Sequence, residues 1–184
     1  MPDQAHEKRA AAAGWHTAVI TAVALVGLVL VFWYFCWGAP TTVLLVRHAD
    51  RQGAADALSP VGLTRAQDLA RVLEKSGISA IYTSEASRTQ DTAAPAAAAL
   101  GVAPVAIPAA YVAGLVTDIR TNHAGQKVLV VGHSNTVPQI IAGFGGPAVA
   151  IGDSEYDNLY VLVQCRCRWT GFGLTNLQYG AASP

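Results

Sequence analysis

The stretch from Thr42 to Gln52 reads TVLLVRHADRQ, and the expected fold follows from it. Its first five residues are mostly apolar and β-favouring, which is typical of a strand buried on both faces of a sheet. An arginine and a histidine, Arg47 and His48, follow directly at the exit of this strand. Ligands bind at the carboxyl ends of strands in open α/β sheets. The pair is therefore a candidate functional site if other loops supply partners.

Strand-like and helix-like segments alternate after this first strand. Pro95 lies inside one helix candidate and predicts a kink or a late break there. The alternation predicts an α/β, three-layer fold, with a mainly parallel mixed sheet flanked by helices and an antiparallel edge at the end. Further strands are expected at 78–84, 102–107, 127–131, 159–169 and 173–180, the last two joined by a turn around Thr170 and Gly171, and helices at 63–77, 87–101, 112–122 and 135–144.

The N-terminal part of the chain is much more apolar than the rest. The 184 residues are 52% hydrophobic and only 13% charged, and residues 17–37 (TAVITAVALVGLVLVFWYFCW) carry no charge. About 20 apolar residues span a bilayer as a helix, and the aromatic residues at the end of this stretch fit an interfacial belt. We expect a tail at 1–16, a transmembrane signal-anchor helix at 17–37 and a catalytic domain at 38–184. A buried core helix is the alternative.

The flanks of the apolar stretch favour an uncleaved anchor. Bulky aromatic residues, rather than the small residues of a cleavage site, close the stretch, and for the same reason Cys36 does not fit a lipidation site. Lys8 and Arg9 precede it, so the positive-inside bias favours a cytoplasmic N-terminus and an extracytoplasmic domain. The 12 basic and 12 acidic residues balance. This gives no surplus for binding nucleic acid.

Three strand exits carry a matching set of polar residues. Arg47 and His48 follow the first strand, Arg88 lies in TSEASRTQDTA after the second, and His133 begins HSNTVP after the strand at 127–131. A neutral imidazole is a competent nucleophile toward phosphorus, and guanidinium groups bind phosphoryl oxygens bidentately. Backbone N–H groups of the helix after His133 are a further candidate for binding the anion. The set indicates phosphoryl transfer through a covalent intermediate. With no P-loop or carboxylate cluster, we expect no cofactor and no metal.

These loops resemble the histidine phosphatase superfamily, which has the phosphoglycerate-mutase-like fold. The matching pieces are VRHAD, LSPVGLTRAQDLA, IYTSEASRTQDTA and VLVVGHSNTVPQI, and they cover nearly all of Thr42 to Gly146. The resemblance implies that His48 is the phosphorylated nucleophile. It also implies that Arg47 and Arg88 bind the phosphate together with a second pocket histidine, His133.

Two features depart from the pattern of this family. Ala49 replaces the glycine that usually follows the nucleophilic histidine, and the usual acidic motif after the second loop is missing. Between Val102 and Asn122 only Asp118 carries a carboxylate, and Asp50 is the other candidate because it lies two residues from His48. The general acid is therefore Asp50, Asp118 or none. Its loss would give a slow enzyme, since acid catalysis contributes about 10² to 10⁴-fold.

Three alternatives compete with the phosphatase. A serine hydrolase would use Ser134 in GHSNT, but no histidine follows it in the chain, contrary to the order of that fold. A pseudophosphatase would bind a phosphorylated ligand without turnover. A metal site would use His48, His133 and Asp50, although the nearby arginines would repel a cation. The favoured interpretation is a membrane-anchored phosphatase acting on a phosphorylated small molecule, a phosphomonoester.

Overall fold

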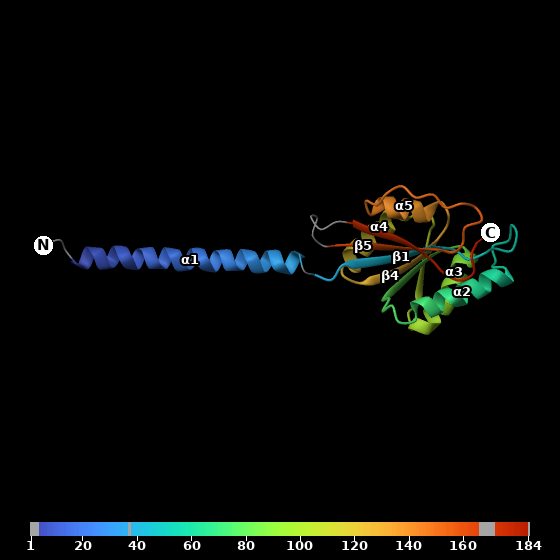
Figure 1. Cartoon of the computed structure of the whole chain (residues 1–184), viewed down its shortest axis with the longest axis horizontal. Helices are drawn as coiled ribbons and strands as arrows, with labels where there is room; N and C mark the ends of the chain where they lie inside the picture. The colour runs from blue at the N-terminus through green and yellow to red at the C-terminus, as the bar shows by residue number, and fades with distance from the viewer. Residues whose placement is uncertain (1–3, 37, 166–171, 184) are drawn as a thin grey trace. The chain divides into compact units, whose positions relative to one another are not determined.

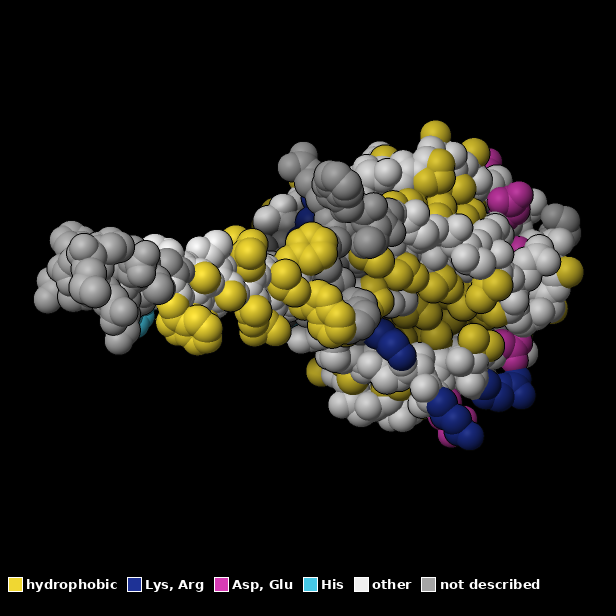
Figure 2. Space-filling view, turned by 60° about the vertical axis from the view of Figure 1, so that its left-hand side comes forward, with side chains coloured by type: hydrophobic (Ala, Val, Ile, Leu, Met, Phe, Trp, Pro, Cys, Tyr) yellow, Lys and Arg dark blue, Asp and Glu magenta, His cyan; other side chains and the backbone are white. Residues whose placement is uncertain are grey.

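The computed structural model describes residues 4–36, 38–165 and 172–183, and the chain divides into two units, residues 1–38 and 39–184. The first unit is a single helix, α1 (Gln4–Cys36) (Figure 1). Its segment Trp15–Tyr34 has a mean hydropathy of 2.3 and is long and apolar enough to cross a membrane. Figure 2 shows hydrophobic side chains exposed along this helix. Trp37 and the side chain of Cys36, which belong to the expected anchor, lie outside the described residues.

The second unit contains a mixed sheet of six strands in the order β3-β2-β4-β1-β5-β6. The first four strands in this order are parallel to one another, and β5 and β6 continue the sheet in antiparallel fashion. The predicted mainly parallel sheet with an antiparallel edge is therefore confirmed. The strands are β1 (Thr41–Arg47), β2 (Ala80–Ser84), β3 (Pro104–Ile107), β4 (Lys127–Gly132), β5 (Asn158–Gln164) and β6 (Phe172–Gln178).

Helices cover both faces of the sheet, so the domain has the three expected layers (Figure 1). Successive strand side chains point to opposite faces, and β1 shows this directly. Val43 and Leu45 pack with the helices α4 (Val112–Asn122) and α5 (Thr136–Gly143). Leu44 and Val46 pack on the other face with α2 (Pro60–Leu73) and α3 (Ser87–Leu100). Because both faces are buried, β1 contains the near-continuous apolar run seen in the sequence.

Two helices depart from the prediction, α2 in its first residue and α3 in the effect of Pro95. α2 begins at Pro60, three residues earlier than predicted, because Ser59 caps it by accepting a hydrogen bond from the N–H of Gly62 and proline suits the first helical turn. α3 continues through Pro95 to Leu100, so the predicted break does not occur. The alanine-rich sequence around Pro95 favours the helix, and its buried face packs into the core. The predicted turn at Thr170 and Gly171 lies outside the described residues.

Candidate active site

The register of β1 against β4 places the two histidines side by side. Arg47 pairs with Gly132, so His48 and His133 are the next residue on each of two adjacent parallel strands. The N–H of His48 donates to the carbonyl of Gly132 at 2.9 Å, which extends the pairing by one bond. The two imidazole rings are edge to face with their centroids 5.5 Å apart. Sheet pairing alone therefore brings these residues together from positions 85 apart in the chain.

His48 is held as a neutral imidazole with a defined proton position. Its Nδ1 lies 2.9 Å from the carbonyl oxygen of Ala49. A carbonyl oxygen only accepts, so Nδ1 carries the proton and Nε2 keeps its lone pair. His48 is 4% exposed. This burial, with smaller effects from Arg47 and Arg88, lowers the pKa of His48 to about 4. Nε2 is therefore available as a nucleophile at neutral pH.

The imidazole of His133 lies between the guanidinium of Arg88 and the hydroxyl of Ser84. Nη2 of Arg88 donates to its Nδ1 at 3.3 Å, and its Nε2 is 2.9 Å from the hydroxyl of Ser84. Burial, followed by the charge of Arg88, lowers the pKa of His133. The N–H of His133 donates to Oγ1 of Thr136 at 2.9 Å, and a side chain at Gly132 would obstruct this hydroxyl because its Cβ would lie only 2.8 Å from it.

Arg47 uses one end of its guanidinium to hold a loop. Its Nη1 donates to the carbonyl oxygens of Gly152, Asp153 and Glu155 at 2.8, 2.9 and 3.1 Å. Its Nη2 makes only a long contact, 3.4 Å, to the hydroxyl of Tyr156, and its Nε is buried without a partner. Nε and Nη2 form the edge of a guanidinium that binds an oxyanion bidentately. That edge of Arg47 is thus available while the other end is fixed.

Arg88 is fixed in a similar way by a carboxylate that we did not predict. Nη1 of Arg88 donates to Oδ1 of Asp56 at 2.7 Å, and the same carboxylate accepts from the backbone N–H groups of Ser87 and Arg88. These hydrogen bonds lower the pKa of Asp56, the largest effect coming from the N–H of Ser87. Nε of Arg88 is buried without a partner, as in Arg47. Asp56 both caps α3 and orients Arg88.

The structure brings the four predicted residues, Arg47, His48, Arg88 and His133, around one open pocket of about 420 Å³. Its volume is within the range of small-molecule sites. Arg51 adds a third positive charge, so three arginines line the pocket against the two carboxylates Glu85 and Asp153. The remaining lining residues are Ala86, Ala109, Ser134 and Asn135. This electrostatic balance favours an anionic ligand.

Neither candidate general acid lines this pocket. Asp50 instead forms an ion pair with the buried Arg65, with Nε to Oδ2 at 2.6 Å. Asp118 accepts a hydrogen bond from the hydroxyl of Tyr82, toward the opposite end of the sheet. Among the described residues, Glu85 provides one carboxylate in the pocket, and its Oε2 accepts from the N–H of Ala109 at 2.6 Å.

The pairing of Asp50 with Arg65 also removes a ligand from the alternative metal site. Arg65 further donates to the carbonyl oxygens of Tyr179 and Ala181, so Asp50 belongs to a structural junction with the C-terminal segment. Within the ranges that the structure describes, no three His, Cys, Asp or Glu side chains are grouped to hold a metal ion. Among the described residues, no third side chain of these types is grouped with the two histidines of the pocket.

Asp56 and the aromatic ring of Tyr156 were not predicted from the sequence. Asp56 lies in a loop more than 30 residues from Arg88, so no local spacing connects the two. The only hint was that α3 begins without a capping side chain of its own, since Ala86 occupies the cap position. Tyr156 lies in the loop before β5, and no local pattern linked it to the pocket.

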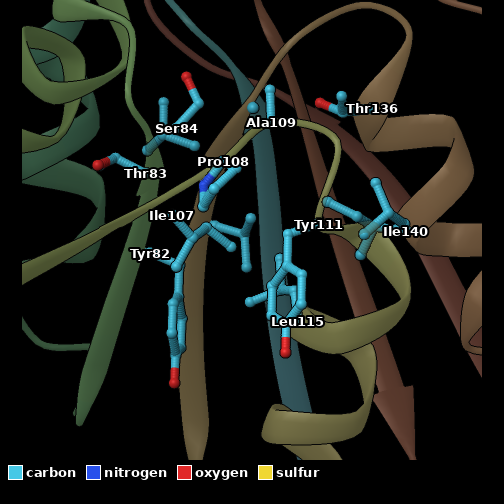
Figure 3. A pocket seen from close by; sticks show the side chains of 14 residues that line it. Tyr82, Thr83, Ser84, Ile107, Pro108, Ala109, Tyr111, Leu115, Thr136 and Ile140 are labelled. Carbon is cyan, nitrogen blue, oxygen red and sulfur yellow. The ribbon is translucent and has the colours of Figure 1, made fainter.

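A second, apolar pocket lies beside the first (Figure 3). Figure 3 shows Ser84, Ala109 and Thr136 at one end of it, with the hydroxyl of Tyr82 pointing toward the other end. Ala109 lines both pockets, and Ser84 and Thr136 both form hydrogen bonds with His133. The segment from Ile107 to Leu115 supplies one wall of it.

The family model and the solved structures that are similar to this chain point to the same family. The model of the histidine phosphatase superfamily (branch 1) matches residues 43–110. No curated protein matches the chain. A protein assigned as the phosphohistidine phosphatase SixA from Agrobacterium tumefaciens is 27% identical, with a TM-score of 0.57, and the match covers 77% of this chain and 99% of that one.

Two more distant structures share the fold. A mycobacterial glucosyl-3-phosphoglycerate phosphatase is 16% identical with a TM-score of 0.59, and the match covers 77% of this chain and 100% of that one. A protein from Escherichia coli assigned as an α-ribazole-5′-phosphate phosphatase is 15% identical with a TM-score of 0.59, covering 78% and 98% of the two chains. The family match, which includes Arg47, His48 and Arg88, and the shared fold agree: residues 43–110 match the histidine phosphatase superfamily, and the domain is similar in fold to phosphatases.

Proposed function

We propose that the chain hydrolyses a phosphomonoester through a phosphohistidine intermediate at His48. One observation carries the proposal. Two guanidinium Nε–H groups, of Arg47 and Arg88, are buried without partners at the pocket that His48 lines. An unpaired buried donor is costly, and more so on a charged group. A phosphoryl group at this place would pair both of them within reach of a neutral imidazole.

The chemistry proceeds in two displacements. Nε2 of His48 attacks phosphorus, the P–N bond forms and the P–O bond to the alcohol breaks, and the departing oxygen takes a proton from water. A water molecule then attacks the phosphohistidine, so a P–O bond forms, the P–N bond breaks, and inorganic phosphate leaves with neutral His48 restored. Arg47 and Arg88 neutralise the charge of the phosphoryl oxygens during both steps.

The open pocket favours water over a second alcohol as the final acceptor. No step of the proposal uses a carboxylic acid, because Oε2 of Glu85 already accepts a hydrogen bond from the N–H of Ala109. The leaving group must therefore depart with little help. We expect aryl phosphates to react faster than alkyl phosphates, by up to the 10² to 10⁴-fold that acid catalysis typically contributes.

We also propose that α1 anchors the enzyme in a membrane, with the N-terminus in the cytoplasm and the domain outside. The uncharged segment Trp15–Tyr34 has the length of a bilayer span, and Lys8 and Arg9 precede it. A reporter fused after Pro184, active only outside the cytoplasm, tests the orientation. Labelling of the reporter from the cytoplasmic side would contradict it.

The decisive experiment traps the phosphoenzyme. The full chain in detergent is mixed with labelled p-nitrophenyl phosphate, quenched in base and mapped by mass spectrometry. We expect an acid-labile label on His48. His48→Ala should lower kcat/KM by at least about 10³-fold, as loss of a nucleophile does, whereas the matched variant His123→Ala should stay within about twofold. Turnover that survives in His48→Ala, or reaction of Ser134 with a fluorophosphonate, would contradict the proposal.

A further inference from the structure

Tyr156 lies in contact with two residues of the pocket although nothing in the motifs points to it. Its ring stacks under the guanidinium of Arg47, with the guanidinium carbon 4.1 Å from the ring centroid. The centroid of the His48 ring is 5.9 Å from that of Tyr156, with the planes tilted by 51°. One aromatic ring thus touches both the expected nucleophile and an expected phosphate ligand.

The backbone on both sides of Tyr156 is fixed by the C-terminal segment. The N–H of Tyr156 donates to the hydroxyl of Ser183 at 2.9 Å. The next residue, Asp157, accepts from the N–H of Ser183 through its carboxylate and from the N–H of Tyr179 through its carbonyl oxygen. These bonds hold the start of β5, so the ring of Tyr156 is presented from a rigid position.

The loop that carries Tyr156 surrounds the guanidinium of Arg47. Carbonyl oxygens of Gly152, Asp153 and Glu155 bind its Nη1, and the ring of Tyr156 covers one of its faces. A guanidinium held both by its end and by its face cannot rotate about its long side chain. Its remaining edge, Nε with Nη2, keeps one direction, and an oxyanion needs such a fixed fork for bidentate binding.

We propose that Tyr156 is a positioning residue of the active site, whose ring orients the Arg47 guanidinium for phosphate and confines the His48 imidazole. The inference rests on the proposed function, which assigns phosphate binding to Arg47 and nucleophilic attack to His48. The ring is the active part, because the hydroxyl makes only the 3.4 Å contact with Nη2 of Arg47. Phenylalanine at position 156 should therefore preserve the function of Tyr156, and leucine should not.

The ring also takes part in keeping water from His48. Burial is the largest cause of the low pKa of His48, and Tyr156 supplies an aromatic part of that burial. A smaller side chain at 156 would let water reach the imidazole and raise its pKa toward 6.5. The charged and titratable groups that face His48 are Arg47 from β1, Arg88 from α3, His133 after β4 and Tyr156 itself, with Arg51, Glu85 and Asp153 around the same pocket.

The test compares Tyr156→Phe and Tyr156→Leu with the wild-type chain in detergent. Leu177→Ala, which shortens an exposed side chain on β6, is the control. We expect Tyr156→Leu to lower kcat/KM for p-nitrophenyl phosphate about tenfold and to weaken inhibition by orthophosphate by a similar factor. Tyr156→Phe and Leu177→Ala should both stay within about twofold of wild type.

An NMR titration of the His48 ring separates positioning from simple stability. The pKa of His48 should rise in Tyr156→Leu and stay near its wild-type value in Tyr156→Phe. Unchanged orthophosphate inhibition and an unchanged His48 titration in Tyr156→Leu would overturn the inference, even if that variant unfolds more easily. Failure of Tyr156→Phe to preserve both would overturn it as well, because the hydroxyl would then be the active part.

The same measurements keep the two proposals apart. If wild-type protein neither hydrolyses p-nitrophenyl phosphate nor forms a phosphoenzyme, the proposed function fails. The His48 titration, and orthophosphate binding followed by the same NMR signals, still decide the role of Tyr156 in that case. If wild type is active and the leucine variant matches it in all readouts, only the inference about Tyr156 fails.

Discussion

The two ends of the sheet contain similar side chains in different states of pairing. At the carboxyl end, His48, His133, Arg47 and Arg88 surround an open pocket, and two guanidinium Nε–H groups have no partner. Toward the other end, the hydroxyl of Tyr82 donates to Asp118 and lies 2.9 Å from Nε2 of His123. Both ends thus combine histidine with charged and hydroxyl-bearing neighbours.

The network toward the amino end is closed on itself. Nδ1 of His123 lies 2.9 Å from the amide oxygen of Gln126, which also accepts from the hydroxyl of Ser79. Burial, followed by the hydrogen bond to Asp118, raises the pKa of Tyr82, so its hydroxyl stays protonated and keeps donating. Here the polar groups satisfy one another, and such networks stabilise a fold. The difference between the two ends indicates that unpaired charged donors identify the candidate site better than a cluster of polar residues does.

The largest expected difference between the two ends comes from their arginines. Arg88→Ala should lower kcat/KM by about 10² to 10³-fold, as loss of a charge-stabilising donor does, because Arg88 lines the pocket, its Nε has no partner and its Nη2 donates to His133. Arg120, on α4, stacks over Phe144 at 5.3 Å and is exposed, so Arg120→Ala should leave kcat/KM within about twofold. Steady-state kinetics with p-nitrophenyl phosphate measures both.

A lysine variant sharpens that comparison. Arg88→Lys keeps the charge but loses the planar fork, so it should recover only part of the lost activity. Equal activity in Arg88→Lys and wild type would mean that only the charge matters. Equal losses in Arg88→Ala and Arg120→Ala would contradict the distinction between an open and a closed end.

A smaller effect is expected at the carboxylates. Asp56→Asn should lower kcat/KM about tenfold, because the neutral amide orients the Nη1 group of Arg88 less strongly. Asp118→Asn removes the same charge toward the closed end and should leave kcat/KM within about twofold while costing about 1 kcal/mol of stability. Kinetics and urea unfolding of the two variants give the answer. If Asp118→Asn were the less active of the two, the assignment of functions to the two ends would be wrong.

Much of this architecture could be predicted because each element has a local cause. The apolar run at Val43 to Val46 indicated a strand buried on both faces, and its pairing with β4 then placed His48 beside His133. Arg88 could be included because its loop also follows a strand. The rule that ligands bind at the carboxyl ends of strands then places the site, because it needs only the residues that follow each strand.

The parts that could not be predicted depend on loops that meet only in three dimensions. Asp56 reaches Arg88 across more than 30 residues, and Tyr156 reaches Arg47 across more than 100. Asp50 looked like a candidate acid because of its distance from His48 in sequence. Its pairing with Arg65, which in turn binds the C-terminal carbonyl groups, follows from tertiary packing that no spacing reveals.

The smallest expected effect is a pH dependence of stability that belongs to the open end. Burial lowers the pKa of His48 from 6.5 to about 4, so between these values the unfolded chain takes up a proton that the folded chain does not. Stability should therefore fall as the pH decreases from about 6.5 to about 4, with a slope of at most about 1.4 kcal/mol per pH unit for this one proton.

His48→Ala removes that titration, so its free energy of unfolding should depend less steeply on pH in this window than that of the wild type. Urea unfolding of both chains across the window gives the two slopes. His133, whose pKa is also lowered by burial, remains in both proteins and contributes equally to them. Parallel curves would mean that His48 takes up its proton as readily in the folded chain as in the unfolded one. The neutral nucleophile, and with it the contrast between the two ends of the sheet, would then lose its physical basis.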